Sequence, residues 1–86
     1  MTTWINNNKE MQKTYSFPDF ETAMQFMQRA TPLITSLDHH PEWTNIYNKV
    51  KVTLTTHDAG HIVTDKDQEL ANLLDGVYAQ MINYNL

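Results

Sequence analysis

Cysteine is absent from this 86-residue chain, and glycine and basic residues are scarce. Without cysteine the protein has no disulfide, no thiolate nucleophile and no cysteine-ligated zinc site. Its two glycines cannot build a glycine-rich phosphate loop. Six lysines and arginines stand against ten acidic residues, and the net charge of −4 argues against direct binding of nucleic acid.

Long apolar runs are also missing, and none approaches the roughly 18 residues that a membrane span requires. The N-terminus lacks the basic and apolar segments of a signal peptide, so we expect a cytoplasmic protein with no membrane partner. The length predicts a single domain over 1–86, without repeats or linkers. Because such a short chain has a thin core, we also expect a homo-oligomer, either a dimer or a tetramer.

Two segments have the pattern of β-structure. Large side chains occupy every odd position from Met11 to Phe17, and the three asparagines at 6–8 predict a turn before them, so we expect a β-hairpin over about 3–17. The second segment, 43–56, is rich in β-formers. Its expected polar face holds Lys49, Lys51, Thr53 and Thr55, opposite Val50, Val52 and Leu54, and Asn48 is a point where it bends or splits.

Two helices are predicted from apolar residues at three- and four-residue steps. Asp19 is a good N-cap for the first, and Pro32 predicts a kink or break near Thr31. Thr64 and Asp67 form an acidic variant of the capping box for the second. The expected apolar faces are Phe20, Ala23, Met24, Met27, Ala30, Leu33, Ile34 and Leu37, and then Leu70, Ala71, Leu73, Leu74, Val77, Tyr78, Met81 and Ile82. The order β-β-α-β(-β)-α predicts an α+β fold with an antiparallel sheet and helices on one face.

The run from Asp38 to Trp43 carries two adjacent histidines where the first long helix must end. The negative end of a helix favours a protonated imidazole, which suits His39 and His40 to hold a proton near neutral pH. Pro41 forces an extended backbone at His40. Taken alone, such a run is more often a plain polar loop, and that interpretation stays open.

A further histidine, His57, is expected at the end of the second β-segment, on its polar face. This position suits a residue that faces a cleft, although a plain surface histidine is the commoner case. His57 and His61 also have the four-residue spacing of helical zinc ligands. Because Ala59-Gly60 interrupts any helix between them, we expect no metal site.

Three segments together resemble the pterin-4a-carbinolamine dehydratase family: His39 to Trp43, Ile46 to Val50, and Leu54 to Gly60. Further similar positions are Trp4, Phe17, Asp19-Phe20, Ala23-Met24, Phe26-Met27, Thr64 and Asp67. The resemblance covers nearly the whole chain. It implies a four-stranded antiparallel sheet with helices on one face, assembly as dimers or tetramers, and an enzyme without a cofactor or metal.

The resemblance also implies which residues act. The catalytic residues would be His39, His40 and His57. The pterin site would comprise His39, His40, Pro41, Thr56, His57, Asp58 and Ala59. Trp43 or Tyr47 is a candidate to stack on the pterin, with core packing as the alternative role.

The implied reaction converts 4a-hydroxytetrahydropterin to quinonoid dihydropterin in tetrahydropterin recycling. A proton leaves N5, and another proton reaches the hydroxyl that departs from C4a. Histidine serves both transfers because it titrates near neutral pH. The alternative function is a non-enzymatic interaction or dimerisation module of the same fold.

Three features depart from the usual pattern of that family. Only three residues precede Trp4, where members usually carry a helix. Thr35 stands where a carboxylate often precedes the first histidine by four residues. Asp38 is the candidate substitute, and the alternative is that Asp38 only helps to end the helix or stands in solvent. The turn from Gly60 to Thr64 is one residue longer than the common form.

Overall fold

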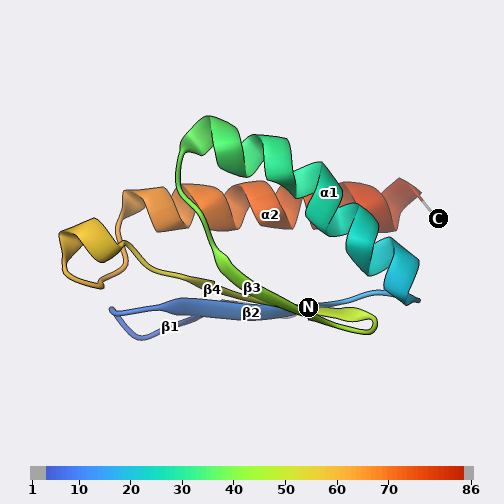
Figure 1. Cartoon of the computed structure of the whole chain (residues 1–86), viewed down its shortest axis with the longest axis horizontal. Helices are drawn as coiled ribbons and strands as arrows, with labels where there is room; N and C mark the ends of the chain where they lie inside the picture. Colours follow the sequence, from blue (N-terminus) through green and yellow to red (C-terminus); the bar gives the residue numbers. More distant parts are fainter. Residues whose placement is uncertain (1–3, 85–86) are drawn as a thin grey trace.

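Four antiparallel strands form one sheet, and two long helices cover one of its faces (Figure 1). The computed structural model describes residues 4–84. The strand order is β1-β2-β4-β3, so β1 and β3 are the sheet edges. The elements are β1 (Ile5–Asn6), β2 (Met11–Ser16), α1 (Phe20–Leu37), β3 (Glu42–Ile46), β4 (Lys49–Leu54), the single-turn 3-10 helix η1 (His57–Ala59) and α2 (Asp65–Tyr84). The predicted α+β fold is confirmed.

The N-terminal hairpin forms as predicted, although residue 3 lies outside the described residues. Asparagine side chains build its turn, because the Asn7 carboxamide oxygen accepts the backbone N–H groups of Lys9 and Glu10 (3.1 and 2.9 Å). The odd positions of β2 face the helices and are buried, from Met11 to Tyr15. This alternation places even a lysine, Lys13, on the covered face of the sheet.

Helix α1 begins at Phe20 because the Asp19 carboxylate accepts the N–H of Thr22 (2.8 Å). The expected break near Thr31 is absent, since α1 continues through Pro32 to Leu37. A proline deletes one backbone hydrogen bond of the helix. The buried residues Ala30 and Ile34, on either side of Pro32, keep α1 packed against its neighbours.

The core lies between the sheet and the two helices. It comprises Met11, Tyr15, Phe17, Ala23, Phe26, Ala30, Ile34, Val50, Val52, Leu54, Leu70, Ala71, Leu74, Val77 and Met81. The predicted helical faces are shifted slightly, because Phe26 is fully buried whereas Phe20, Leu33 and Ile82 are exposed. Trp43 packs against this core, and Tyr47 is exposed at the turn after β3.

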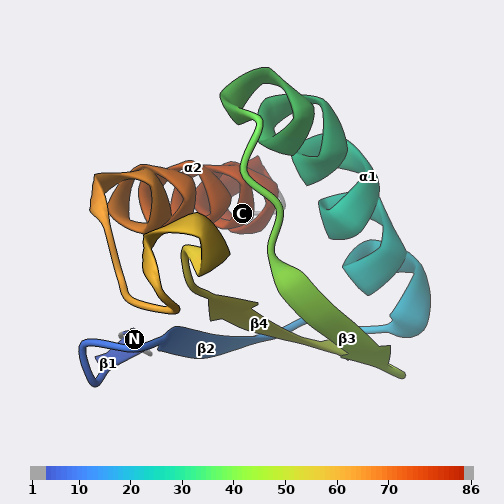
Figure 2. The ribbon, with the colours of Figure 1, turned by 60° about the vertical axis from the view of Figure 1, so that its left-hand side comes forward.

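The second β-segment splits at Tyr47-Asn48 into β3 and β4, as the asparagine suggested. Its far end differs from the prediction. Thr55 is buried, with its hydroxyl donating to the Lys9 carbonyl (2.7 Å), so it does not belong to the polar face. The strand ends at Leu54, and His57 therefore lies on η1 instead of on a strand face. Figure 2 shows η1 beside the start of α2.

None of the helices within residues 4–84 is long and apolar enough to cross a membrane.

Candidate active site

The first histidine is placed by the end of α1. Asp38 adopts a left-handed backbone (φ 55°, ψ 43°), and its N–H donates to the carbonyls of Ile34 and Thr35, which ends the helix. The chain then turns away, and His39 begins the connection to β3. The side chain of His39 is only 11% exposed, and its Nε2 lies 2.5 Å from Oδ1 of Asp67.

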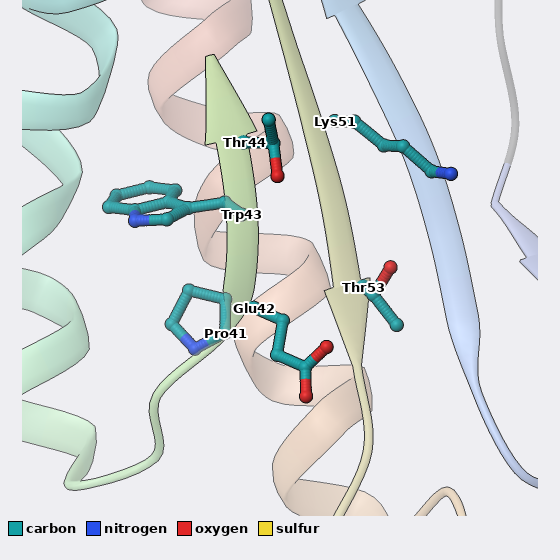
Figure 3. Close-up of a pocket in the computed structure, with 6 residues that line it drawn as sticks. All are labelled: Pro41, Glu42, Trp43, Thr44, Lys51 and Thr53. Carbon is teal, nitrogen blue, oxygen red and sulfur yellow. The ribbon is translucent and has the colours of Figure 1, made fainter.

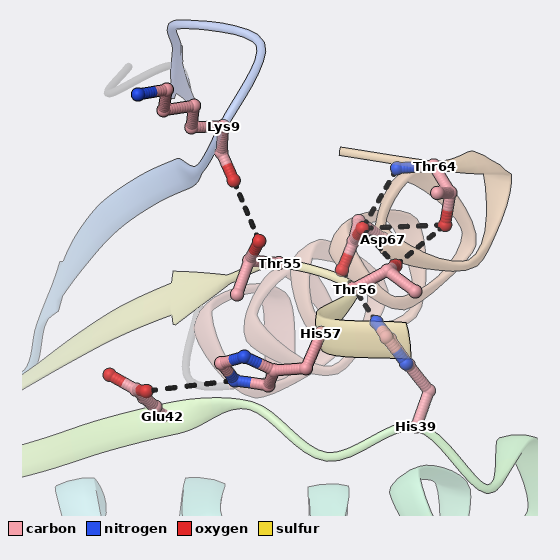
Figure 4. A network of polar contacts seen from close by, with 8 residues as sticks. All are labelled: Lys9, His39, Glu42, Thr55, Thr56, His57, Thr64 and Asp67. Atoms are coloured by element: carbon pink, nitrogen blue, oxygen red, sulfur yellow. Dashed lines mark hydrogen bonds and ion pairs between the residues drawn. The ribbon is translucent and has the colours of Figure 1, made fainter. Parts of the chain in front are cut away.

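Asp67 is the centre of a buried polar network (Figure 4). One carboxylate oxygen contacts His39. The other accepts the Thr56 hydroxyl (2.7 Å) and the backbone N–H of Thr64 (2.9 Å). The bond from the Thr64 N–H is half of the predicted capping box, so Asp67 both caps the first turn of α2 and contacts His39. The hydroxyls of Thr56 and Thr64 lie 2.7 Å apart and join the two segments further.

The surroundings of Asp67 set the charge of its carboxyl group. Burial opposes ionisation, but hydrogen bonds from His39, Thr56 and the Thr64 N–H outweigh it, and the pKa of Asp67 lies below its usual value. The carboxylate is therefore ionised near neutral pH. Such a group fixes which imidazole nitrogen carries a hydrogen, because Nε2 must donate to it. The second nitrogen of His39, Nδ1, is then the one that can exchange a proton with a ligand.

His57 approaches the same region from η1. Its side chain is 66% exposed, and its Nε2 lies 4.0 Å from Oε1 of Glu42 at the start of β3. Figure 4 shows that His39 reaches from the segment before β3 toward Asp67, whereas His57 reaches back from η1 toward Glu42. Two imidazoles thus occupy the space between the 39–42 segment and the 55–64 segment.

The other predicted site residues lie around this pair. His40 is exposed, and no hydrogen bond or ion pair of the described residues involves its side chain. Asp58 and Ala59 are exposed on η1. Asp38, the expected supporting carboxylate, is exposed at the end of α1, and no bond among the described residues joins it to a histidine. The carboxylate against His39 is Asp67.

Sequence reasoning placed Asp67 in a cap but missed its contact with His39. A signal was present, because Asp67 stands three, four and seven residues before Leu70, Ala71 and Leu74 on the apolar stripe of α2. A carboxylate on such a stripe is buried and needs partners. The Glu42 contact of His57 carried no comparable signal.

A cleft of about 520 Å³ adjoins this region (Figure 3). Its lining residues are Pro41, Glu42, Trp43, Thr44, Lys51 and Thr53, from the start of β3 and from β4. None of the three predicted catalytic histidines lines it. It borders the site through Glu42, the residue that His57 approaches. Of the two histidines in contact with carboxylates here, His57 is exposed and His39 is largely buried.

The arrangement is suited to proton transfer. It combines a histidine fixed by a buried carboxylate, a second exposed histidine, and a third, His40, in solvent. No group of three or more histidine, aspartate or glutamate side chains within residues 4–84 is arranged to hold a metal ion.

Comparisons with known proteins point to one family. A model of the family described as pterin 4 alpha carbinolamine dehydratase matches residues 1–77. A protein of Prochlorococcus marinus (strain NATL2A) is 48% identical over 73 residues, which cover 85% of this chain and 76% of that protein. A protein of Opitutus terrae is 47% identical over 74 residues, which cover 86% of this chain and 76% of that protein. Both relatives carry the name "putative pterin-4-alpha-carbinolamine dehydratase".

Two solved structures share the fold. A "transcriptional coactivator/pterin dehydratase" from Brucella melitensis has a TM-score of 0.82 and 38% identity, covering 87% of this chain and 81% of its own. A "pterin dehydratase-like protein", described as a RuBisCO assembly factor of the alpha-carboxysome, has a TM-score of 0.74 and 18% identity, covering 90% of each chain. The second likeness bears on the fold alone.

Proposed function

Because this chain belongs to the pterin 4 alpha carbinolamine dehydratase family, we propose that it dehydrates 4a-hydroxytetrahydropterin to quinonoid dihydropterin by acid–base catalysis. The observation that carries the proposal is the contact between His39 and the buried, ionised Asp67, beside the exposed His57. Family membership supplies the reaction, and this geometry supplies groups that suit it. His39, His40, Pro41, Thr56, His57, Asp58 and Ala59 form the proposed pterin site.

The proposed mechanism moves two protons. His57 accepts the proton of N5, and the electron pair left on N5 forms the N5–C4a double bond. The C4a–O bond breaks at the same time, and the hydroxyl leaves as water after taking a proton from His39 or His40. With its Nε2 held by Asp67, His39 presents Nδ1 as the donor. The negative charge of Asp67 stabilises the imidazolium before transfer, which is the role of a carboxylate that orients a catalytic histidine.

A dehydration assay tests the proposal. The variants are His39→Gln, His40→Gln and His57→Gln. Thermal unfolding of each variant is the control for correct folding. We expect each of His39→Gln and His57→Gln to lower turnover by about 10²–10⁴-fold, the usual contribution of one acid–base group. Turnover should persist in EDTA, because the proposed steps need no metal. Loss of turnover in EDTA with recovery on adding zinc would contradict the mechanism, and wild-type rates equal to the uncatalysed rate would contradict the function.

The alternative is a binding module without catalysis. The 18%-identical relative is described as an assembly factor, which makes such a role possible for this fold. A folded wild-type chain that fails to dehydrate the carbinolamine would favour this alternative.

A further inference from the structure

His61, the one histidine outside the proposed mechanism, has an unusual backbone. Its φ is 62°, in the left-handed region, directly after Gly60 at φ 91°. An L-residue there costs about 1–2 kcal/mol relative to the right-handed conformation. The bonds that hold it are from its own N–H to the Thr56 carbonyl (3.1 Å) and from the Thr56 N–H to the Ile62 carbonyl (3.0 Å). Strain of this kind persists where the surrounding structure imposes it, often beside functional groups.

The imidazole of His61 lies between a carboxylate and the proposed catalytic His57. Its Nε2 is 3.3 Å from Oε2 of Glu10, at the end of the hairpin turn. The centroids of the His57 and His61 rings are 5.3 Å apart, with the rings tilted by 57°. Glu42 approaches His57 from β3. The four side chains thus form a series in the order Glu10, His61, His57, Glu42.

Two hydrogen bonds to backbone carbonyls fix the hairpin turn relative to the segment that leads from β4 to α2. The N–H of Val63 donates to the Asn8 carbonyl (2.8 Å), and the buried hydroxyl of Thr55 donates to the Lys9 carbonyl (2.7 Å). Glu10 therefore has a defined position beside the loop. The contact between Glu10 and His61 joins two parts of the chain that are already held together.

His57 needs such support more than His39 does. His39 is nearly buried and bonded to Asp67, whereas the side chain of His57 is 66% exposed and its contact with Glu42 is long, at 4.0 Å. An exposed side chain on a one-turn helix occupies several rotamers unless neighbours restrict it. Catalysis requires the reactive nitrogen to be held close to its productive position.

We propose that His61, held by Glu10, is a positioning residue that restricts the imidazole of His57. The inference rests on the proposed function, since it gives His57 a catalytic task. His61 touches no reacting atom. Its ring packs beside that of His57, and the left-handed backbone at His61 places the ring there.

The test compares His61→Gly and Glu10→Gln with wild type. Glycine removes the ring and also relieves the left-handed strain, so the variant should fold at least as stably as wild type. We expect kcat to fall about threefold to tenfold in His61→Gly, as for a displaced but present catalytic group, while KM changes by less than about twofold. The kcat of Glu10→Gln should lie between those of wild type and His61→Gly, because glutamine keeps a hydrogen-bonding oxygen. Glu69→Gln, an exposed carboxylate on α2, is the matched control and should behave as wild type.

Two further measurements separate positioning from a structural role. In a His57→Gln background, His61→Gly should have no additional effect, because a residue that acts through another loses its effect with it. The ring signals of His57 in NMR spectra should broaden or shift in His61→Gly, and those of His39 should not. Unchanged kcat together with unchanged His57 signals would overturn the inference. The NMR arm needs no turnover, so it still decides the question if the wild-type chain proves inactive and the proposed function fails.

Discussion

At the residue scale, the distinction between Asp67 and Asp38 matters most for the proposed chemistry. The sequence offered Asp38 as a candidate for the carboxylate that supports a histidine, with ending the helix as its alternative role, whereas the structure has Asp67 against His39, with Oδ1 2.5 Å from Nε2. Asp67 is fully buried and Asp38 is exposed. A buried carboxylate in contact acts on an imidazole far more strongly than an exposed charge that water screens.

The first prediction compares these two aspartates by the same substitution. Asp67→Asn should lower turnover by about tenfold to a hundredfold, because His39 loses both the charge and the fixed tautomer. Asp38→Asn should leave turnover near that of wild type, and asparagine tolerates the left-handed backbone there. The measurement is a pH–rate profile for each variant with thermal unfolding as a folding control. Equal losses in the two variants, or a loss in Asp38→Asn alone, would restore the assignment drawn from the sequence.

At the scale of elements, the partly exposed carboxylate of Asp75 joins α2 to the N-terminal hairpin. The Asp75 carboxylate accepts hydrogen bonds from the ammonium of Lys13 (2.7 Å), the hydroxyl of Tyr15 (2.6 Å) and the indole N–H of Trp4 (3.0 Å). Burial opposes its ionisation, but these bonds outweigh it and the pKa of Asp75 lies below its usual value. Burial, with a smaller contribution from Asp75, raises the pKa of Tyr15, which therefore stays neutral.

The second prediction is that this contact makes stability depend on pH. A depressed folded-state pKa adds stability that is complete above the ordinary aspartate pKa, about 3.9, and is lost as the pH falls through the lower folded value. Asp75→Asn should destabilise the protein at pH 7 by about 1–2 kcal/mol, because the Lys13 ammonium, 7% exposed, loses its counter-charge, while water screens part of the interaction at the Asp75 side chain, which is 38% exposed. Urea unfolding from pH 7 to pH 3 should show a shallower decline in Asp75→Asn. Parallel declines in the two proteins would contradict the prediction.

The third prediction concerns the proline inside α1. Pro32 is exposed and lacks the N–H that would bond the Gln28 carbonyl, so Pro32→Ala should restore one helical bond. The gain is offset in part because alanine frees the unfolded chain. We expect the free energy of unfolding to rise by about 1–2 kcal/mol, from the cost of an interior proline less this offset. Pro18→Ala, just outside the helix, is the control and should not stabilise. Equal stabilities in urea would show that α1 has adapted to the proline.

At the scale of the whole molecule, the sheet described within residues 4–84 has two edge strands of unequal length, β1 and β3. β1 has two residues and β3 has five. The large side chains of Ile46, at the end of β3, and Tyr47, in the turn that follows, are both about two-thirds exposed. A long edge strand with apolar side chains invites pairing with another chain. The 10.0 kDa chain also has a small core.

The fourth prediction is a homodimer that pairs through β3. Light scattering at micromolar concentration should give twice the chain mass. Ile46→Lys should shift the protein toward the monomer, because a lysine on an edge strand opposes strand pairing. Ile5→Lys, an equally exposed isoleucine on the β1 edge, is the matched control and should leave the mass unchanged. A wild-type monomer, or dissociation by Ile5→Lys alone, would count against this arrangement.

The sequence by itself determined the elements, because their signals are local. Alternation from Met11 to Phe17 requires a strand with one covered face, and the Asp19 cap fixes the start of α1 within a residue. The sequence also indicated the family, because the histidine motif of that family is a local pattern that can be recognised along the chain. Of the kink or break expected near Thr31, the break does not occur, since α1 continues through Pro32 with Ala30 and Ile34 packed on the core.

The tertiary structure alone decided which side chains meet. Asp67 and His39 are 28 residues apart in the chain, and Glu10 and His61 belong to different turns. Periodicity assigns a residue to a face of its own element, but contact between elements depends on how the helix layer is seated on the sheet. The burial of Thr55 has the same origin, because its hydroxyl donates to the Lys9 carbonyl in the hairpin turn, a long-range contact that no local pattern encodes.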